Sequence, residues 1–176
     1  LLLLCRNIEG YRNLIDLVST GYLDGFYYKP RIDKELLASK SKGLICTSAC
    51  LRGDLNEALL DEGYEAGRRI AYTYLDIFGK DNFYLEVQDH GLDLDKQLLP
   101  QVFRLSRETG IPMVATNDAH YLTKEDAGAH EALLCIQTGK TLSDPNRMRF
   151  STDEFYVKSR AEMLALFDGD SAPLDR

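Results

Sequence analysis

Two patterns of apolar residues alternate along the chain, short continuous runs and longer stretches in which apolar residues recur every three or four positions. The first pattern is typical of buried strands and the second of amphipathic helices. The runs that predict strands are residues 1–5, 44–47, 83–87 and 111–114, with 155–157 as a further short candidate. The stretches that predict helices are residues 9–20, a short segment after Asp33, and residues 55–60, 64–78, 99–109, 124–138 and 160–167. The alternation predicts an α/β fold of parallel strands joined by crossover helices.

Helix boundaries are marked by capping residues. Asp33 precedes a short helix, and two capping boxes start later helices, Thr123 with Asp126 and Ser159 with Glu162. Proline suits only the first turn of a helix, so Pro100 indicates that the regular part of the helix that ends at residue 109 begins near Leu99.

Polar side chains follow three of the predicted strands. Cys50 follows the second strand, His90 the third, and Asp118 and His120 the fourth. In parallel α/β folds, sites gather at the carboxyl ends of the strands. Asp118 and His120 are two residues apart and are expected to project to the same side. A carboxylate oxygen and an imidazole nitrogen suit a divalent metal such as Zn or Mn, and the alternative is a capped turn with a solvated histidine.

Other polar residues leave two interpretations open. Cys50 is either a thiolate ligand or a small buried residue. His90, Asp89 and Glu86 form either a ligand set or an acid–base group, and Glu86 alternatively only faces polar neighbours in its strand. His130 lies mid-helix and is expected on a solvated face.

The segment GFYYKPRID combines two tyrosines with two cations, Lys29 and Arg31. It is either a phosphate or nucleic-acid contact or a loop docked by its tyrosines. The small number of cations favours the second interpretation.

The composition indicates a single globular domain and argues against a broad nucleic-acid-binding surface. The 176 residues, 44% of them hydrophobic, suffice for one domain with a sizeable core. A net charge of −7 argues against a broad nucleic-acid-binding face. The cysteines form no CxxC pair, which favours reduced thiols in the cytoplasm, and Cys5, Cys46 and Cys135 are expected in the core. No apolar stretch is long enough to span a membrane, so no membrane partner is expected.

Several catalytic classes lack their motifs. The sequence has no Walker loop, no G-x-S-x-G and no H-E-x-x-H, which argues against nucleotide binding through a Walker loop and against serine-based acyl transfer. The chain has no initiator Met and starts within an apolar run, so it is expected to be part of a longer protein.

Six phrases together resemble one family, namely GFYYKPRID, LICTSACLRGDL, FYLEVQDHG, VATNDAHYL, LLCIQTGKTL and RFSTDEFYVKS. They are similar to the polymerase-and-histidinol-phosphatase (PHP) domain of bacterial DNA polymerase III alpha subunits. The resemblance covers about residues 1–167, which are expected to form the later part of a PHP domain, with residues 168–176 as a tail or linker.

The resemblance implies a partial, distorted (β/α)7 barrel, similar to a TIM barrel, with metals at the carboxyl ends of its strands. It implies a metal-dependent phosphoesterase that acts as a 3′–5′ proofreading exonuclease in the intact protein. Cys50 matches a cysteine ligand of the family, and Asp118 and His120 match its final Asp-x-His pair, as metal ligands and catalytic residues. His90 matches a histidine that either binds metal or shapes the rim. The implied cofactors are divalent ions, Zn or Mn and also Mg.

The resemblance also implies partners, namely DNA through the parent polymerase, a proofreading subunit and the sliding clamp. The family's upstream metal ligands and its palm, fingers and thumb are not in this sequence. The fragment alone is therefore expected to be catalytically poor. One alternative is an idle structural module that buttresses the polymerase or docks the proofreading subunit, and another is a free-standing phosphatase.

Overall fold

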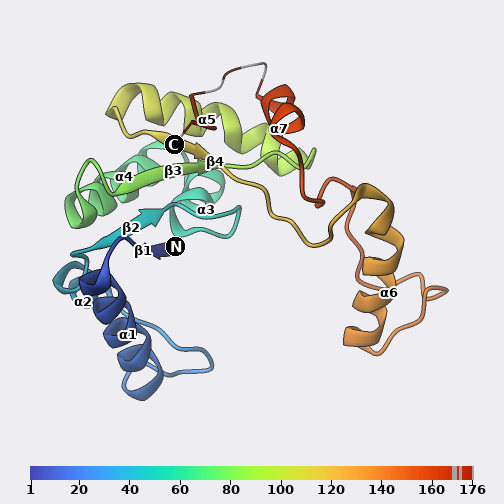
Figure 1. Cartoon of the computed structure of the whole chain (residues 1–176), viewed down its shortest axis with the longest axis horizontal. Helices are drawn as coiled ribbons and strands as arrows, with labels where there is room; N and C mark the ends of the chain where they lie inside the picture. Colours follow the sequence, from blue (N-terminus) through green and yellow to red (C-terminus); the bar gives the residue numbers. More distant parts are fainter. Residues whose placement is uncertain (168–169, 171, 176) are drawn as a thin grey trace. The chain divides into compact units, whose positions relative to one another are not determined.

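The computed structural model describes residues 1–167, 170 and 172–175, which form a mixed α/β fold (Figure 1). The strands are β1 (Leu2–Cys5), β2 (Leu44–Thr47), β3 (Phe83–Val87) and β4 (Met113–Ala115). The helices are α1 (Ile8–Leu23), α2 (Lys34–Ser39), α3 (Asp54–Asp61), α4 (Tyr64–Phe78), α5 (Asp93–Thr109), the 3-10 turn η1 (Lys124–Asp126), α6 (Ala127–Thr138) and α7 (Arg160–Leu166). The α/β class and four of the five predicted strands are confirmed. Residues 155–157 form no strand, only an isolated bridge from Tyr156 to Tyr121.

The strands form one sheet in the order β1-β2-β3-β4. β2 and β3 are parallel, as predicted, with Cys46 opposite Phe83. The hydrogen bonds between β3 and β4 also advance in the same direction, from Leu85 N to Pro112 O (2.9 Å) and from Thr116 N to Val87 O (3.1 Å). Most of the sheet therefore has the parallel arrangement that crossover helices produce.

The prediction of parallel strands is wrong for β1, which pairs antiparallel with β2, Leu3 opposite Cys46. The chain leaves β1 and enters β2 at the same end, where Arg6 N–H donates to Gly43 O (2.9 Å). A Cβ on Gly10 would lie 1.8 Å from Gly43 O, so only glycine lets the start of α1 approach this turn. An apolar run identifies a strand but carries no information on its direction.

The described chain divides into two compact units. The first consists of Leu1–Glu86 with Gln101–Met113, and the second of Val87–Pro100 with the described residues from 114 onwards. The first has a core centred on α3, α4, β2 and β3, which includes Leu55, Leu59, Ala71, Phe83, Leu85, Leu105 and Ile111. The second buries Val87, Leu98, Leu134, Cys135, Phe155, Met163 and Phe167. Each large apolar side chain that is fully buried contributes about 1.5–3 kcal/mol to the free energy of unfolding.

The capping predictions are confirmed. The side chain of Asp33 caps α2. The N–H of Thr123 donates to Asp126 Oδ2 (2.9 Å) ahead of η1 and α6, and the N–H of Ser159 donates to Glu162 Oε2 (2.8 Å) ahead of α7. These caps satisfy N–H groups that have no partner within their helices.

The structure differs from the predicted limits of two helices. α5 is helical from Asp93, with Pro100 inside it. Asp95 Oδ2 accepts hydrogen bonds from the N–H groups of His90 (2.9 Å) and Leu92 (3.1 Å), which fixes the chain at the start of α5 ahead of the proline. α1 continues through Gly21 to Leu23, three residues beyond the predicted end at residue 20.

Of the expected tail, residues 168–176, the structure describes residues 170 and 172–175. Residues 168, 169, 171 and 176 lie outside the described residues. Pro173 is buried, and its carbonyl accepts a hydrogen bond from Ala115 N–H of β4 (2.8 Å). The part of the tail around Pro173 therefore packs against β4. In the described part of the chain, no helix is both long and apolar enough to cross a bilayer.

Candidate functional site

Asp118 and His120 lie in the loop that follows β4. Their side chains are close together, with His120 Nε2 3.4 Å from Asp118 Oδ1, and both are partly exposed, at 37% for His120 and 47% for Asp118. β4 ends at Ala115, so strand alternation is not what aligns them. A tight turn, in which Ala119 N–H donates to Asn117 O (2.9 Å), brings them together.

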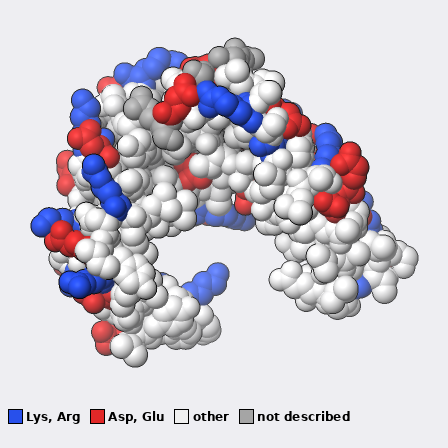
Figure 2. Space-filling model, in the orientation of Figure 1, with Lys and Arg blue, Asp and Glu red and all other residues white. Residues whose placement is uncertain are grey.

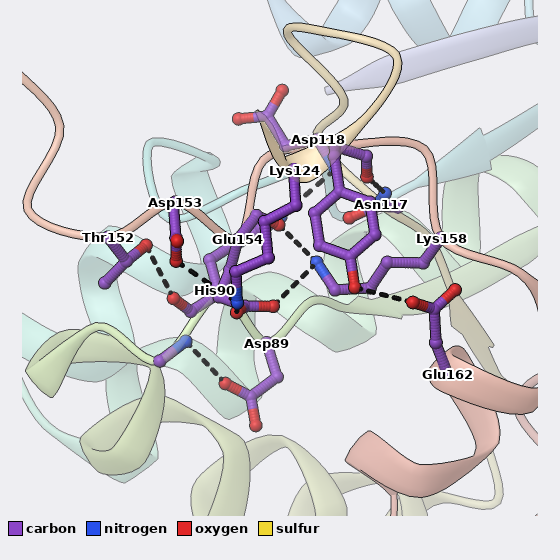
Figure 3. A network of polar contacts seen from close by, with 12 residues as sticks. Asp89, His90, Asn117, Asp118, Lys124, Thr152, Asp153, Glu154, Lys158 and Glu162 are labelled. Carbon is purple, nitrogen blue, oxygen red and sulfur yellow. Dashed lines mark hydrogen bonds and ion pairs between the residues drawn. The ribbon is translucent and has the colours of Figure 1, made fainter. Parts of the chain in front are cut away.

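His90 supports this loop from the buried side. Its Nε2 accepts a hydrogen bond from the backbone N–H of Asp118 (3.2 Å), and the residue as a whole is only 3% exposed (Figure 3). Burial lowers the pKa of His90 although the carboxylates of Asp95 and Asp118 lie nearby. An Nε2 that accepts a hydrogen bond requires the neutral imidazole with its proton on Nδ1.

Aromatic rings surround His120. Phe150 meets it edge-on with ring centroids 4.9 Å apart, His130 lies at 5.4 Å and Phe155 at 5.7 Å. The prediction that His130 is on a solvated helix face is wrong, because it is half-buried and packs against Tyr121 and Phe150. Residue spacing within α6 did not reveal these contacts, since the partners come from other segments.

A cavity of about 330 Å³ lies among these rings, lined by residues that include Tyr121, His130, Phe150 and Thr152. Of the two carboxylates in its wall, Glu131 pairs with Arg147 (2.8 Å) and Asp153 with Lys124 (3.4 Å). The second unit thus has a cavity near His120 with aromatic walls, and the charges of its two wall carboxylates are offset by Lys124 and Arg147.

Asp89 and Glu86 differ in their surroundings. Asp89 is half-buried, and its Oδ1 accepts from Gly91 N–H (2.9 Å), which stabilises the turn after His90. Glu86 is buried in the first unit, where its carboxylate accepts a hydrogen bond from Thr47 Oγ1 and its N–H donates to Ser48 Oγ (2.9 Å). Glu86 therefore faces polar neighbours in the sheet, as one of the two interpretations expects.

Cys50 is half-buried in the turn between β2 and α3. Its carbonyl accepts from Gly53 N–H (2.8 Å) and from Asn56 Nδ2 (2.9 Å), so the backbone at this position is held on two sides. Cys46 and Cys135 are buried as predicted, and burial raises the pKa of the Cys46 thiol to about 12. Cys5 is exposed, so its prediction as a core residue is wrong, because β1 is a largely exposed strand.

Lys29 and Arg31 are both exposed. The guanidinium of Arg31 lies over the ring of Tyr27, 4.8 Å from its centroid, and Tyr27 N–H donates to Lys29 O (3.1 Å). Tyr27 and Tyr28 are 63% and 84% exposed, so the tyrosines do not dock this loop onto the core. The alternative of a phosphate contact by the two cations stays a prediction.

The Asp118–His120 pair fits two positions in the coordination shell of a divalent ion. With metal–ligand bonds of about 2.0–2.1 Å and tetrahedral angles, two ligand atoms lie about 3.4 Å apart. This is the observed separation of Oδ1 and Nε2. Among the described residues, no group of three or more His, Cys, Asp or Glu side chains is placed to hold a metal ion. Cys50 belongs to the first unit and the pair to the second, so their convergence stays a prediction.

Comparison with known proteins gives two further observations. Residues 1–90, which include Cys50, Glu86, Asp89 and His90, match the family model of the PHP domain. The chain is 50% identical over 167 residues to the DNA polymerase III subunit alpha of Treponema pallidum, 50% over 163 residues to that of Deinococcus radiodurans, and 46% over 166 residues to that of Thermus aquaticus. These alignments cover 95%, 93% and 94% of this chain but only 14%, 12% and 14% of the respective relatives.

Proposed function

Because the chain belongs to the PHP domain family, we propose that it is part of the alpha subunit of a bacterial replicative DNA polymerase. In that protein it hydrolyses phosphodiester bonds with the aid of divalent metal ions. The observation that carries this proposal is the Asp118–His120 pair, whose oxygen and nitrogen are 3.4 Å apart at the surface of the loop after β4. The substrate is the 3′ end of DNA, and the reaction is 3′–5′ proofreading. The domain extends to residue 167 and contributes to a distorted (β/α)7 barrel.

Each residue of the proposed site has a separate task. Asp118 contributes a carboxylate oxygen, His120 contributes Nε2, and Cys50 contributes a thiolate to the ion, which is Zn, Mn or Mg. The bound ion supplies activation of water and neutralises charge on the phosphate. His90 binds no metal in this proposal, because its Nε2 holds the backbone of Asp118.

DNA reaches this site mainly through other parts of the polymerase. Figure 2 shows cationic and anionic side chains interspersed on the visible face, and the net charge is −7. Non-specific DNA binding needs several cations that neutralise phosphates. Lys29 and Arg31 add a local phosphate contact. Nucleotide transfer belongs to the rest of the parent protein, which works in the cytoplasm with a proofreading subunit and the sliding clamp.

The second candidate function is a structural module that stabilises the polymerase or docks its proofreading subunit. One observation favours it, namely that the described residues hold no group of three metal-competent side chains. In this case Asp118 and His120 only stabilise their loop.

The experiment compares the full-length parent with its Asp118→Asn variant, which removes a charged ligand with little change in volume. Asp93→Asn is the matched control, since Asp93 is also an exposed aspartate of the second unit but pairs only with Lys96 among the contacts described for it. Loss of a metal-positioning partner costs 10–100-fold, so loss of a ligand itself should lower the rate of 3′–5′ hydrolysis by about 100-fold or more. The polymerase rate and the melting temperature should stay within error.

Two results separate the candidates. Chelator-sensitive hydrolysis that Asp118→Asn removes and Asp93→Asn retains supports the enzyme. A parent without hydrolysis, or an Asp118→Asn variant that loses polymerase activity and melting temperature together, supports the structural module.

A further inference from the structure

We propose that Phe155 is the positioning residue of the Asp118–His120 pair, an inference that rests on the function proposed above. Phe155 lies 35 residues beyond His120 in the sequence and outside residues 1–90, which match the family model. All the contacts that carry the proposal lie within the second unit.

The backbone of Phe155 holds the loop that carries His120. Its carbonyl accepts hydrogen bonds from the N–H of His120 (2.7 Å) and of Tyr121 (3.3 Å). The neighbouring residues extend this contact, since Val157 N–H donates to Leu122 O (3.3 Å) and Asn117 Nδ2 donates to Tyr156 O. The loop after β4 is therefore bound along its length by a segment that forms no strand.

The ring of Phe155 acts on Asp118 through His90. It stacks on the His90 imidazole with centroids 4.5 Å apart and an angle of 5° between the planes, and Phe155 is only 7% exposed. The same imidazole accepts the hydrogen bond from Asp118 N–H. A flat ring against the imidazole limits its rotation, and this rotation would break the hydrogen bond.

The segment that carries Phe155 is itself anchored on both sides (Figure 3). Before Phe155, Thr152 Oγ1 donates to His90 O (2.9 Å), and Glu154 pairs with Lys124 of η1 (2.5 Å). After it, the Lys158 ammonium, with a side chain only 2% exposed, pairs with Glu154 Oε2 (3.3 Å). Hydrogen bonding to Lys124 lowers the pKa of the Glu154 carboxyl, so these contacts are ionic at neutral pH.

Through these contacts, Phe155 stabilises the positions of both Asp118 and His120. The carbonyl of Phe155 binds the backbone N–H of His120. Its ring packs on His90, which in turn binds the backbone N–H of Asp118. The proposed ion needs both ligand atoms at a set separation, so the rate of hydrolysis should depend on a side chain that touches neither metal nor DNA.

The test uses the full-length parent with Phe155→Leu, which keeps an apolar side chain but removes the flat ring. The matched control is Phe167→Leu, the same change at a residue of the same unit with similar burial (6% against 7%). Phe155→Tyr keeps the ring. The readouts are the rate of 3′–5′ hydrolysis, Mn²⁺ affinity, and hydrogen exchange of the peptide that spans residues 116–122.

The expected result is that Phe155→Leu speeds exchange of this peptide about five- to tenfold, which corresponds to the loss of one hydrogen bond. Hydrolysis and Mn²⁺ affinity should fall about tenfold or more, as for other residues that orient metal ligands. Phe155→Tyr should retain the rate of hydrolysis and the Mn²⁺ affinity of the parent, and Phe167→Leu should also leave these two quantities unchanged. Equal exchange in Phe155→Leu and Phe167→Leu would overturn the proposal. If the parent shows no hydrolysis, the proposed function fails, whereas the exchange comparison still decides the role of Phe155.

Discussion

The backbone N–H of Asp118 donates a hydrogen bond to Nε2 of His90, which lies 28 residues earlier in the chain (3.2 Å). The Nε2 lone pair is therefore directed at the backbone. Nδ1 of the neutral ring carries the proton and offers no lone pair either. This arrangement favours His90 as a support of the loop over the alternative in which it binds metal.

The turn that carries Cys50 should depend on Gly53. A Cβ at this position would lie 2.1 Å from Ser48 O, so Gly53→Ala forces the turn to move. Overpacking of this kind costs about 1–3 kcal/mol. We expect the alkylation rate of Cys50 in the full-length parent to rise, as followed by mass spectrometry of the labelled peptide.

Gly128→Ala is the control for this substitution. Gly128 lies in α6, and a Cβ there would meet nothing within 4 Å. Gly128 lies in the first turn of α6, where the advantage of alanine over glycine is at most the ~0.5–1 kcal/mol found in a helix interior. α6 should therefore exchange no faster than in the parent, and Cys50 should react at its usual rate. Unchanged Cys50 reactivity in Gly53→Ala would contradict the close packing of the turn.

The start of α7 should weaken in acid. Ser159 holds the Glu162 carboxylate through its hydroxyl (2.6 Å) and backbone N–H (2.8 Å), which lower the pKa of Glu162 from 4.5 to about 2. A carboxyl whose pKa is lower in the folded state stabilises that state fully above pH 4.5. The stabilisation is lost as the pH falls from 4.5 towards 2, because the unfolded chain takes up the proton first.

Ser159→Ala should therefore reduce the exchange protection of α7 about fivefold at neutral pH, and Ser159→Thr should retain most of it. The difference between parent and Ser159→Ala should shrink between pH 4.5 and 2. A difference that is independent of pH would show that the Glu162 half of the capping box contributes nothing.

Lys29 and Arg31 offer a test of DNA contact. Each cation that neutralises a phosphate of duplex DNA adds about 0.9 to the slope of log affinity against log salt. If both contact phosphates, the double change Lys29→Ala and Arg31→Ala should lower the slope of the full-length parent by about 2. Lys80→Ala with Lys96→Ala is a matched pair of changes at surface lysines, and it should leave the slope unaltered. An equal slope in all three proteins would contradict the contact.

Local signals in the sequence predicted much of the fold. The capping boxes at Thr123 and Ser159 were confirmed because a cap is decided by residues three positions apart. The strands β2 and β3 were confirmed because they are short apolar runs in a buried sheet. The direction of β1 was wrong, because strand pairing depends on where a long connection returns and not on residues within the run.

In the candidate site, too, features set by residues close in sequence were predicted, and contacts between distant segments were not. The proximity of Asp118 and His120 was predicted from their spacing, although a turn and not a strand produces it. The ring contacts of Phe155 and His130 were missed, because their partners lie in separate segments and stacking between rings leaves no periodic pattern in the sequence.

The position of a bound ion decides whether Asp118 and His120 bind a metal. Crystals of the full-length parent should be grown with Mn²⁺, and anomalous scattering should be recorded at the Mn edge. We expect a peak within about 2.0–2.2 Å of Asp118 Oδ1 and His120 Nε2, with Cys50 Sγ as a further ligand at about 2.3–2.5 Å. This peak should be lost in His120→Ala. A peak that binds neither Asp118 nor His120, or a fully occupied site that persists in His120→Ala, would contradict it.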